Sequence, residues 1–335
     1  MEELIYPVLV EFSTLILLVV IGISLFLLGK GADILVSEAV SLSLRWGVPK
    51  MIVGATIVSL GTTLPEASVS VLAAIKGNPD LALGNAIGSI IANTGLIIGI
   101  AALIGTLTID KDTIKRQGKY QLLSGVLLAV VSLPFFSKGP NGIITQKMGF
   151  IFVILLIIYI YGSIRYAKKY NGDISTEFTE EENPVLLQLI KLVLGIALVI
   201  ISSKILIPSV EIIALRGGIP QGVIAATLVA FGTSLPELVT AITAVRKGHG
   251  DLAIGNIIGA DILNVLFVVG SAAAVTKKGL IVPSTFYKLQ IPTMLIILVA
   301  FHIFAKNKDS IITKLEGVFL VGIYTTYLIL NYIWI

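Results

Sequence analysis

The sequence predicts an all-α polytopic membrane protein with about ten transmembrane helices, arranged as two inverted five-helix repeats with broken helices at the midplane. Three observations lead to this fold class: the composition, an internal repeat and the distribution of basic residues. Of the 335 residues, 56% are hydrophobic and only 13% are charged, and the mean hydropathy is +0.99. Soluble domains carry roughly 25% charged residues. A chain this apolar belongs in a lipid bilayer.

The predicted spans follow from apolar stretches bounded by charges and helix breakers, since a membrane helix needs about 20 mostly apolar residues. We expect them at 12–29 (with a helix that can extend to about 44), 49–75, 80–106, 120–136, 146–166, 186–215, 220–245, 251–275, 286–304 and 312–333. The polar connection at 168–184 divides the chain into a first repeat at 1–167 and a second at 185–335. The first segment has no Lys or Arg and so lacks the basic start of a signal peptide, and we expect its span to be retained.

The internal repeat joins residues 55–99 to residues 226–270, which align without a gap and share 21 identities in 45 positions. The identities concentrate in two blocks. The first is GTTLPE at 61–66 against GTSLPE at 232–237, and the second is GNAIGSIIAN at 84–93 against GNIIGADILN at 255–264. Each half therefore contains the same two motifs in the same order.

The distribution of basic residues indicates how the chain crosses the membrane. With the N-terminus outside, 14 Lys and Arg residues fall in cytoplasmic loops and seven fall in outside loops. The positive-inside rule therefore favours this orientation. We expect a multi-pass protein of the cell membrane whose linker, 168–184, is cytoplasmic. An odd number of spans separates the two repeats, so the second enters the membrane from the opposite face.

The first motif predicts a break in the middle of a membrane helix. Pro65 cannot donate a backbone hydrogen bond, and Gly61 weakens the same turn. Freed backbone groups are tolerated at this depth only where they face protein or a polar cavity. Glu66 directly follows the break, where a carboxylate is costly and usually functional, and Glu237 repeats the arrangement. The alternative for a single copy is a kinked helix whose glutamate is bonded to a neighbour.

The residue types around these breaks indicate a site for a hard cation. Carboxylates, hydroxyls and freed carbonyls are the oxygen ligands that suit Ca²⁺ and Na⁺. The first motif supplies Glu66, Thr62 and Thr63, and the second supplies Glu237, Thr233 and Ser234. The chain has no Cys and only two His residues, which argues against thiolate metal sites and histidine general-base chemistry.

The second motif combines small residues with a polar stripe. Gly84, Gly88 and Ala92 lie four apart, which favours close packing of that helix face against a partner. Asn85, Ser89 and Asn93 are also spaced four apart, and their counterparts are Asn256, Ala260 and Asn264. We expect Asn93 and Asn264 to be cation ligands.

Together these blocks resemble the α-repeats of the cation/calcium antiporter superfamily, closest to its sodium/calcium exchanger branch. The resemblance covers essentially the whole chain in span count and spacing, and its specific motifs lie at 54–99 and 225–270. It implies a central cation site lined by Glu66, Glu237, Asn93, Asn264, Ser59, Thr62, Thr63, Ser89, Thr233 and Ser234, with Ala230 contributing its carbonyl.

Two positions depart from the family pattern. Ala260 stands where Ser is common, so one hydroxyl ligand is missing, and Asp261 stands where Asn is frequent. Asp261 lies three residues before Asn264, so it can add a third carboxylate to the site, hold a proton, or cap a neighbouring segment.

The resulting hypothesis is a secondary antiporter, and not an enzyme, that exchanges Ca²⁺ for Na⁺ by alternating access. The two transported ions would compete for one site between Glu66 and Glu237, with no cofactor. The first spans of the two halves, 12–44 and 186–215, hold no site residue and are expected to slide. The alternatives are a Ca²⁺/H⁺ or K⁺-coupled antiporter, a cation channel, and an intramembrane hydrolase. Cytoplasmic basic loops explain the pI of about 9.1 without nucleic acid, and a monomer can form a complete site whatever its oligomeric state.

Overall fold

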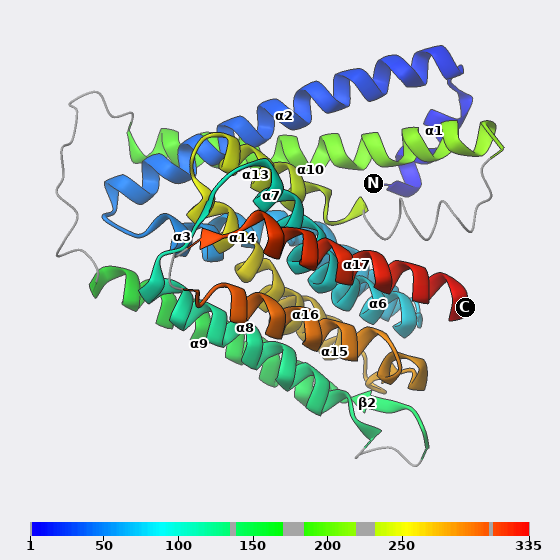
Figure 1. Cartoon of the computed structure of the whole chain (residues 1–335). Coiled ribbons are helices and arrows are strands. Elements are labelled where there is room, and N and C mark those ends of the chain that lie inside the picture. The colour runs from blue at the N-terminus through cyan, green and yellow to red at the C-terminus, as the bar shows by residue number, and fades with distance from the viewer. Residues whose placement is uncertain (1, 135–138, 170–183, 219–231, 308–310, 335) are drawn as a thin grey trace.

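The chain is almost entirely helical in this computed structural model, which describes residues 2–134, 139–169, 184–218, 232–307 and 311–334 (Figure 1). Within those ranges, seven helical stretches are long and apolar enough to cross a membrane, and a bent pair makes an eighth. The chain is therefore a multi-pass membrane protein. The seven stretches are Thr14–Arg45, Pro79–Ile104, Gln146–Ala167, Val185–Arg216, Gly250–Ala274, Ser284–Phe304 and Lys314–Ile333.

Several of these stretches contain more than one helical segment. The α-helices are α1 (Glu2–Glu11), α2 (Thr14–Arg45), α3 (Lys50–Val53), α4 (Ser59–Thr62), α5 (Leu64–Ile75), α6 (Pro79–Ile91), α7 (Ile98–Ile104), α8 (Lys111–Ser132), α9 (Gln146–Lys169), α10 (Val185–Arg216), α13 (Leu235–Arg246), α14 (Gly250–Leu263), α15 (Gly270–Ala274), α16 (Gln290–Phe304) and α17 (Lys314–Trp334). Between them lie the π-helical segments η1 (Gly54–Val58), η2 (Ala92–Ile97) and η5 (Asn264–Val269), and the 3₁₀ helix η6 (Ser284–Tyr287).

The predicted spans agree with the structure at most positions. The first one continues as a single helix to Arg45, and the one at 49–75 is the bent pair Lys50–Thr62 and Leu64–Ile75, with a bend of 46°. Two predictions differ or are incomplete. The span expected at 120–136 belongs to α8, which begins at Lys111. The first half of α8 is too highly charged for this helix to count as a membrane span by composition. Part of the span expected at 220–245 lies outside the described residues, as does most of the linker.

Two long helices, α2 and α10, form a separate layer beside the rest of the molecule (Figure 1). They run antiparallel, since Arg216 at the end of α10 donates hydrogen bonds to Thr14 Oγ1 and to Val10 O. Glycines let their backbones approach closely: a Cβ on Gly195 would lie 2.9 Å from Leu35 N. This contact makes the two helices one packing unit.

The centre of the molecule consists of the two stretches that carry the GN motifs. In an apolar stretch of 18 residues within each helix, buried residues make up 94% in Gly250–Ala274 and 72% in Pro79–Ile104. The same share is 28% in α2 and in α10. A helix buried on all sides by other helices can carry polar groups without exposing them to lipid. The core thus holds the candidate site, and α8, α9, α16 and α17 surround it (Figure 1).

Two short antiparallel strand pairs connect the halves of the sequence. Strand β1 (Leu107–Thr108) pairs with β4 (Ile311–Ile312), and β2 (Gly142–Ile144) pairs with β3 (Leu280–Val282). Each pair joins a loop of the first half to a loop of the second half, so the loops also tie the two halves together.

Candidate functional site

The two glutamates of the repeated motif occupy the same position in two half-helices. Glu66 lies in the first turn of α5 and Glu237 in the first turn of α13, and neither side chain is exposed to solvent. A proline, Pro65 or Pro236, occupies the same first turn, where its missing N–H costs no helical hydrogen bond. The free N–H groups and the dipole at a helix start stabilise a negative charge. The predicted helix break therefore becomes a helix start facing protein.

The packing of the helices brings the two repeats together crosswise. Helix α5, which carries Glu66, packs against η5, which begins at Asn264. Helix α13, which carries Glu237, packs against η2, which contains Asn93. Each glutamate is therefore next to the segment that carries the asparagine of the other repeat.

Hydrogen bonds across the repeats bring several of the candidate residues together. Thr63 Oγ1 donates to Glu237 Oε1 at 3.5 Å, and Thr62 Oγ1 donates to Asn256 Oδ1 at 3.4 Å. In the other direction, Thr233 Oγ1 donates to the Oδ1 atom of Asn85 at 3.1 Å. Residues about 150 to 195 positions apart in sequence thus share one polar cluster.

Asn85 itself holds the backbone of the first break. Its Nδ2 atom donates to the carbonyl of Glu66 at 3.1 Å and to Ser70 Oγ at 2.9 Å. The polar residues predicted to form a stripe on this helix therefore have two different environments. Asn85 braces the backbone at the glutamate, whereas Ser89 Oγ and Asn93 Oδ1 have no hydrogen-bond partner.

Unpartnered buried oxygens distinguish this cluster from an ordinary buried polar network. Almost every buried polar atom in a protein has a hydrogen-bond partner, and an unpartnered one costs about 1–3 kcal/mol. Seven acceptor oxygens of the predicted site residues lack one: Glu66 Oε1 and Oε2, Glu237 Oε2, Asn93 Oδ1, Asn264 Oδ1, Ser89 Oγ and Ser234 Oγ. Carboxylate, amide and hydroxyl oxygens are the donor set that Ca²⁺ and Na⁺ accept, so the cluster fits a hard cation.

Three further predicted residues have different surroundings. Ser59 is buried, and its Oγ donates weakly to Thr56 O at 3.4 Å. Thr233 is half-buried and bonded to Asn85. Ala230 lies outside the described residues.

Asp261 lies beside the cluster, and both its oxygens accept hydrogen bonds. Its Oδ1 accepts from Asn93 Nδ2 at 3.2 Å, and its Oδ2 accepts from Thr94 Oγ1 at 2.5 Å and from Gln121 Nε2 at 2.7 Å. All four side chains are buried. The bond from Asn93 fixes the direction of its amide: the nitrogen faces Asp261, and the oxygen is left unpartnered.

Sequence reasoning missed Thr94 and Gln121. Gln121 belongs to a buried polar row along α8, at positions one turn apart: Thr113, Gln117, Gln121 and Ser124. Polar residues recurring every three or four positions in an apolar helix were a signal that α8 faces a polar partner. The π-helical segments at Asn93 and Asn264 had no comparable signal, although such segments frequently mark functional sites.

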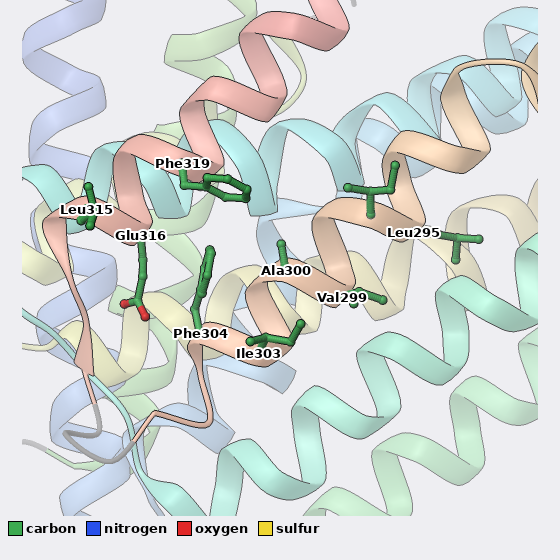
Figure 2. Close-up of a pocket in the computed structure, with 9 residues that line it drawn as sticks. Leu295, Val299, Ala300, Ile303, Phe304, Leu315, Glu316 and Phe319 are labelled. Atoms are coloured by element: carbon green, nitrogen blue, oxygen red, sulfur yellow. The ribbon is translucent and has the colours of Figure 1, made fainter.

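A groove on the described part of the molecule shares no residue with this cluster. It has a volume of about 680 Å³ and lies between α16 and α17, as Figure 2 shows. Its walls are aliphatic and aromatic. Its one carboxylate, Glu316, accepts hydrogen bonds from the backbone and hydroxyl of Thr313. The groove offers a cation no further oxygen side chain.

A multi-pass helical protein whose broken helices bring buried oxygen ligands together in its core has the architecture of a secondary ion transporter. The chain belongs to the sodium/calcium exchanger protein family, whose model matches residues 16–165 and 187–333.

Individual relatives span almost the whole chain. The inner membrane protein YrbG of Escherichia coli is 33% identical over 92% of this chain and 95% of its own length. The sodium/calcium exchanger MaX1 of Methanosarcina acetivorans is 31% identical over 92% of this chain and 96% of its own length. Among solved structures, one of the sodium-calcium exchanger NCX_Mj is 27% identical, with a TM-score of 0.79 over 94% of this chain and 98% of that one.

Proposed function

We propose that this protein exchanges Ca²⁺ for Na⁺ across the cell membrane by alternating access. The observation that carries this proposal is the set of seven unpartnered oxygens on Glu66, Glu237, Asn93, Asn264, Ser89 and Ser234. A buried carboxylate that is ionised and lacks hydrogen-bond donors needs a cation as its partner. MaX1, which is 31% identical to this chain, and NCX_Mj, whose structure shares its fold, are named as sodium/calcium exchangers.

Exchange follows from the sharing of one site. Ca²⁺ takes six to eight oxygens, and the seven unpartnered oxygens fall within that range. Ser59, Thr62, Thr63, Thr233 and the carbonyl of Ala230 are further candidate ligands. Several Na⁺ ions would occupy the same oxygens. Because Ca²⁺ and Na⁺ both need Glu66 and Glu237, binding of one excludes full binding of the other. Each ion therefore has to leave before the other is carried back.

Within this site we assign Asp261 a positioning role. Its two oxygens accept three hydrogen bonds from Asn93, Thr94 and Gln121, whereas the glutamate oxygens are almost free. The carboxylate therefore orients the Asn93 amide, so that its oxygen can contact a cation.

The ten-span arrangement with two inverted repeats is part of the proposal, with the first repeat at 1–167, the linker at 168–184 and the second repeat at 185–335. Elements of equal length occur in the same order in the two halves, which supports this arrangement. Helices α2 and α10 both have 32 residues, α5 and α13 both have 12, and η2 and η5 both have six. The β1–β4 and β2–β3 pairs match in the same way, each joining one loop from either half.

Alternating access would move the α2–α10 unit against the core. Neither helix carries a site residue, and the two pack on each other more extensively than any other pair of described elements. The N-terminus would lie outside and the linker in the cytoplasm, where the basic loops are. The relative YrbG is named an inner membrane protein, which agrees with a cell-membrane location.

Reconstituted vesicles test this function. Vesicles loaded with Na⁺ should take up labelled Ca²⁺ when external Na⁺ is diluted, and the uptake should stop when the Na⁺ gradient is collapsed. A K⁺ or H⁺ gradient of the same size should not replace it. Uptake that follows a K⁺ or H⁺ gradient instead would favour the other antiporters, and uptake that needs no counter-ion gradient would indicate a channel.

The site assignment is tested in the same vesicles. Glu66→Gln and Glu237→Gln should each reduce exchange to background, because the amide keeps the shape and removes the charge that binds Ca²⁺. Glu11→Gln, at an exposed position outside the core, is the matched control and should leave exchange unchanged. Transport retained by either core variant would contradict a shared site.

A further inference from the structure

We infer that Tyr159 of α9 is a positioning residue of the ion site: its hydroxyl holds the backbone carbonyl of Ala55 and so fixes the π-helical segment η1, which leads directly to the candidate ligand Ser59. The inference rests on the proposed function, because it concerns the geometry of the same site. Tyr159 lies near the middle of α9, and its side chain is buried. Helix α9 also packs against η5, which begins at Asn264, so α9 contacts a π-helical segment of each half.

The ordinary helical donor of the Ala55 carbonyl is used elsewhere. In an α-helix, the N–H of Ser59 would bond to the carbonyl four residues earlier, which is that of Ala55. At the end of η1 the same N–H donates to the carbonyls of Gly54 and Thr56 instead. A buried backbone carbonyl is costly to leave without a donor. The π-helical geometry of η1 therefore calls for a donor from another element.

The hydroxyl of Tyr159 supplies this donor. It lies 3.1 Å from Ala55 O and 3.1 Å from Oε1 of Gln117, a buried residue of α8. A hydroxyl has one hydrogen, so the two oxygens compete for it. Backbone of α14 covers the same carbonyl from another side, because a Cβ on Gly259 would lie 2.5 Å from Ala55 O. The Ala55 carbonyl is thus held between α9 and α14.

The direction of the Tyr159 side chain is itself fixed by its neighbours. Its ring packs edge-on against the ring of Tyr120 on α8, with 5.8 Å between the centroids and 83° between the planes. Its partner Gln117 also donates from Nε2 to Oγ of Ser163, one turn farther along α9, at 3.5 Å. These contacts place the hydroxyl at the carbonyl before any ion binds.

The segment fixed in this way carries ligands of the first motif. Helix α4 follows η1 directly and contains Ser59 and Thr62, and Thr62 Oγ1 reaches Asn256 Oδ1 of the second motif. A π-helical turn holds one more residue than an α-helical turn. If η1 relaxed toward an α-helix, Ser59 and Thr62 would rotate about the helix axis by up to roughly 100°. The hydroxyl of Tyr159 therefore keeps these candidate ligands directed at the site.

Calcium binding to the purified full-length protein tests the inference without measuring transport. The dissociation constant for Ca²⁺ is measured by equilibrium dialysis in detergent without Na⁺. The test variant is Tyr159→Phe, which removes only the hydroxyl. Tyr120→Phe is the matched control, because it removes the same group from the neighbouring ring. Gln117→Leu is a second comparison, because it removes the competing acceptor and leaves the hydroxyl to Ala55 O.

We expect the Kd for Ca²⁺ to rise about fivefold in Tyr159→Phe and to stay within about twofold of the wild type in Tyr120→Phe and Gln117→Leu. Hydrogen–deuterium exchange, measured without Ca²⁺, should become faster at 54–63 in Tyr159→Phe, because η1 loses a hydrogen bond there.

An unchanged Kd in Tyr159→Phe would overturn the inference, as would an equal rise in Gln117→Leu. Faster exchange throughout the chain of Tyr159→Phe would also overturn it, because the hydroxyl would then serve folding in general. If the wild type binds no Ca²⁺, the proposed function fails and the inference fails with it. Binding by the wild type with no effect of Tyr159→Phe leaves the proposed function standing and removes the inference alone.

Discussion

At the scale of single residues, the site depends on which way an amide points. Asn93 and Asn264 occupy matching positions in π-helical segments, yet their surroundings differ. Asn93 donates to Asp261, whereas neither side-chain atom of Asn264 has a partner. Asp261, which with Ala260 breaks the symmetry of the two motifs, therefore orients one candidate ligand, Asn93, more firmly than its counterpart Asn264. The effect acts through hydrogen bonding to Asn93.

Asp261→Asn should weaken Ca²⁺ binding without abolishing exchange. The variant loses a charged acceptor for the amide of Asn93, so the asparagine oxygen is less often directed at the cation. We expect the KM for Ca²⁺ to rise by about tenfold, since a hydrogen bond to a charged group contributes about 1.5–3 kcal/mol and about 1.4 kcal/mol corresponds to a factor of ten. Gln121→Leu should shift the KM in the same direction by a smaller factor, because it removes one donor to Asp261. An unchanged KM in both variants would assign Asp261 to folding alone.

At the scale of elements, glycines decide how closely the two repeats meet. The backbone of α14 packs directly on α3 and η1: a Cβ on Gly255 would lie 2.1 Å from Met51 O, and one on Gly259 would lie 2.5 Å from Ala55 O. This close approach belongs to the second copy of the GN motif, whereas the small-residue face was predicted for the first copy, where a Cβ on Gly88 would meet no described atom within 4 Å. In the first copy, the nearest described atom to a Cβ on Gly84 is Phe286 Cζ at 3.8 Å. Close approach is what brings Thr62 within reach of Asn256.

Gly255→Ala should destabilise the protein even though alanine favours helices. The added methyl has to displace backbone, and overpacking of this kind costs roughly 1–3 kcal/mol or more. The thermal unfolding temperature in detergent measures the loss. Gly322→Ala in α17 is the control, because its Cβ would meet no described atom within 4 Å. Similar unfolding temperatures for the two variants would mean that α14 can shift without penalty.

The contact between Lys50 and His249, where α3 meets the start of α14, should depend on pH. The Nζ atom of Lys50, at the start of α3, lies 3.1 Å from Nδ1 of His249, which is the N-cap residue of α14. Burial, and then the charge of Lys50, lower the pKa of His249 below its ordinary value of 6.5. Because the folded-state pKa is lower than the unfolded one, the contribution to stability is complete above about pH 6.5 and is lost as pH falls through the lower value.

We therefore expect the unfolding temperature of the wild type to fall as the pH is lowered below about 6.5, because a protonated His249 repels Lys50. His249→Asn removes the titrating group, so its unfolding temperature should fall less over the same range. The comparison uses the difference between the two proteins, since other groups titrate in both. Identical pH profiles would exclude a contribution from this contact.

At the scale of the whole molecule, the unpartnered oxygens lie where the two halves of the chain meet. A cation bound there contacts both halves and should hold them together. Such a ligand stabilises the folded state by mass action, by about 2.7 kcal/mol at a concentration one hundred times its Kd. If the proposed site binds an ion, binding should therefore raise the overall stability of the protein.

Addition of Ca²⁺ should therefore raise the unfolding temperature of the purified protein, and a chelator should reverse the shift. Na⁺ at higher concentration should produce a smaller shift in the same direction, because it occupies the same oxygens with less charge. Glu237→Gln should abolish both shifts, and Glu11→Gln should retain them. A Ca²⁺ shift that survives in Glu237→Gln would place the stabilising ion elsewhere.

The hydropathy pattern and the internal repeat were enough to predict most of the membrane-spanning helices among the described residues and the recurrence of the two motifs. Apolar length determines whether a segment crosses the bilayer, and this property is local. The boundaries of α8 were not predictable in the same way: its first half is charged and polar, and its place in the bundle follows from buried contacts such as Gln121 with Asp261. A hydropathy pattern does not show which distant residue a buried polar side chain will contact.

For the candidate site as well, the sequence determined some features and the tertiary structure decided the others. The sequence alone determined that Glu66 and Glu237 follow matching helix breaks and that hydroxyls and amides accompany them, because a proline and a glycine act on the backbone beside them. Only the tertiary structure decided that Thr63 bonds Glu237, that Asn93 faces Asp261, and that the glutamate oxygens are left almost without donors. Those outcomes depend on crossed packing between residues more than 160 positions apart, which neighbouring residues in the chain do not specify.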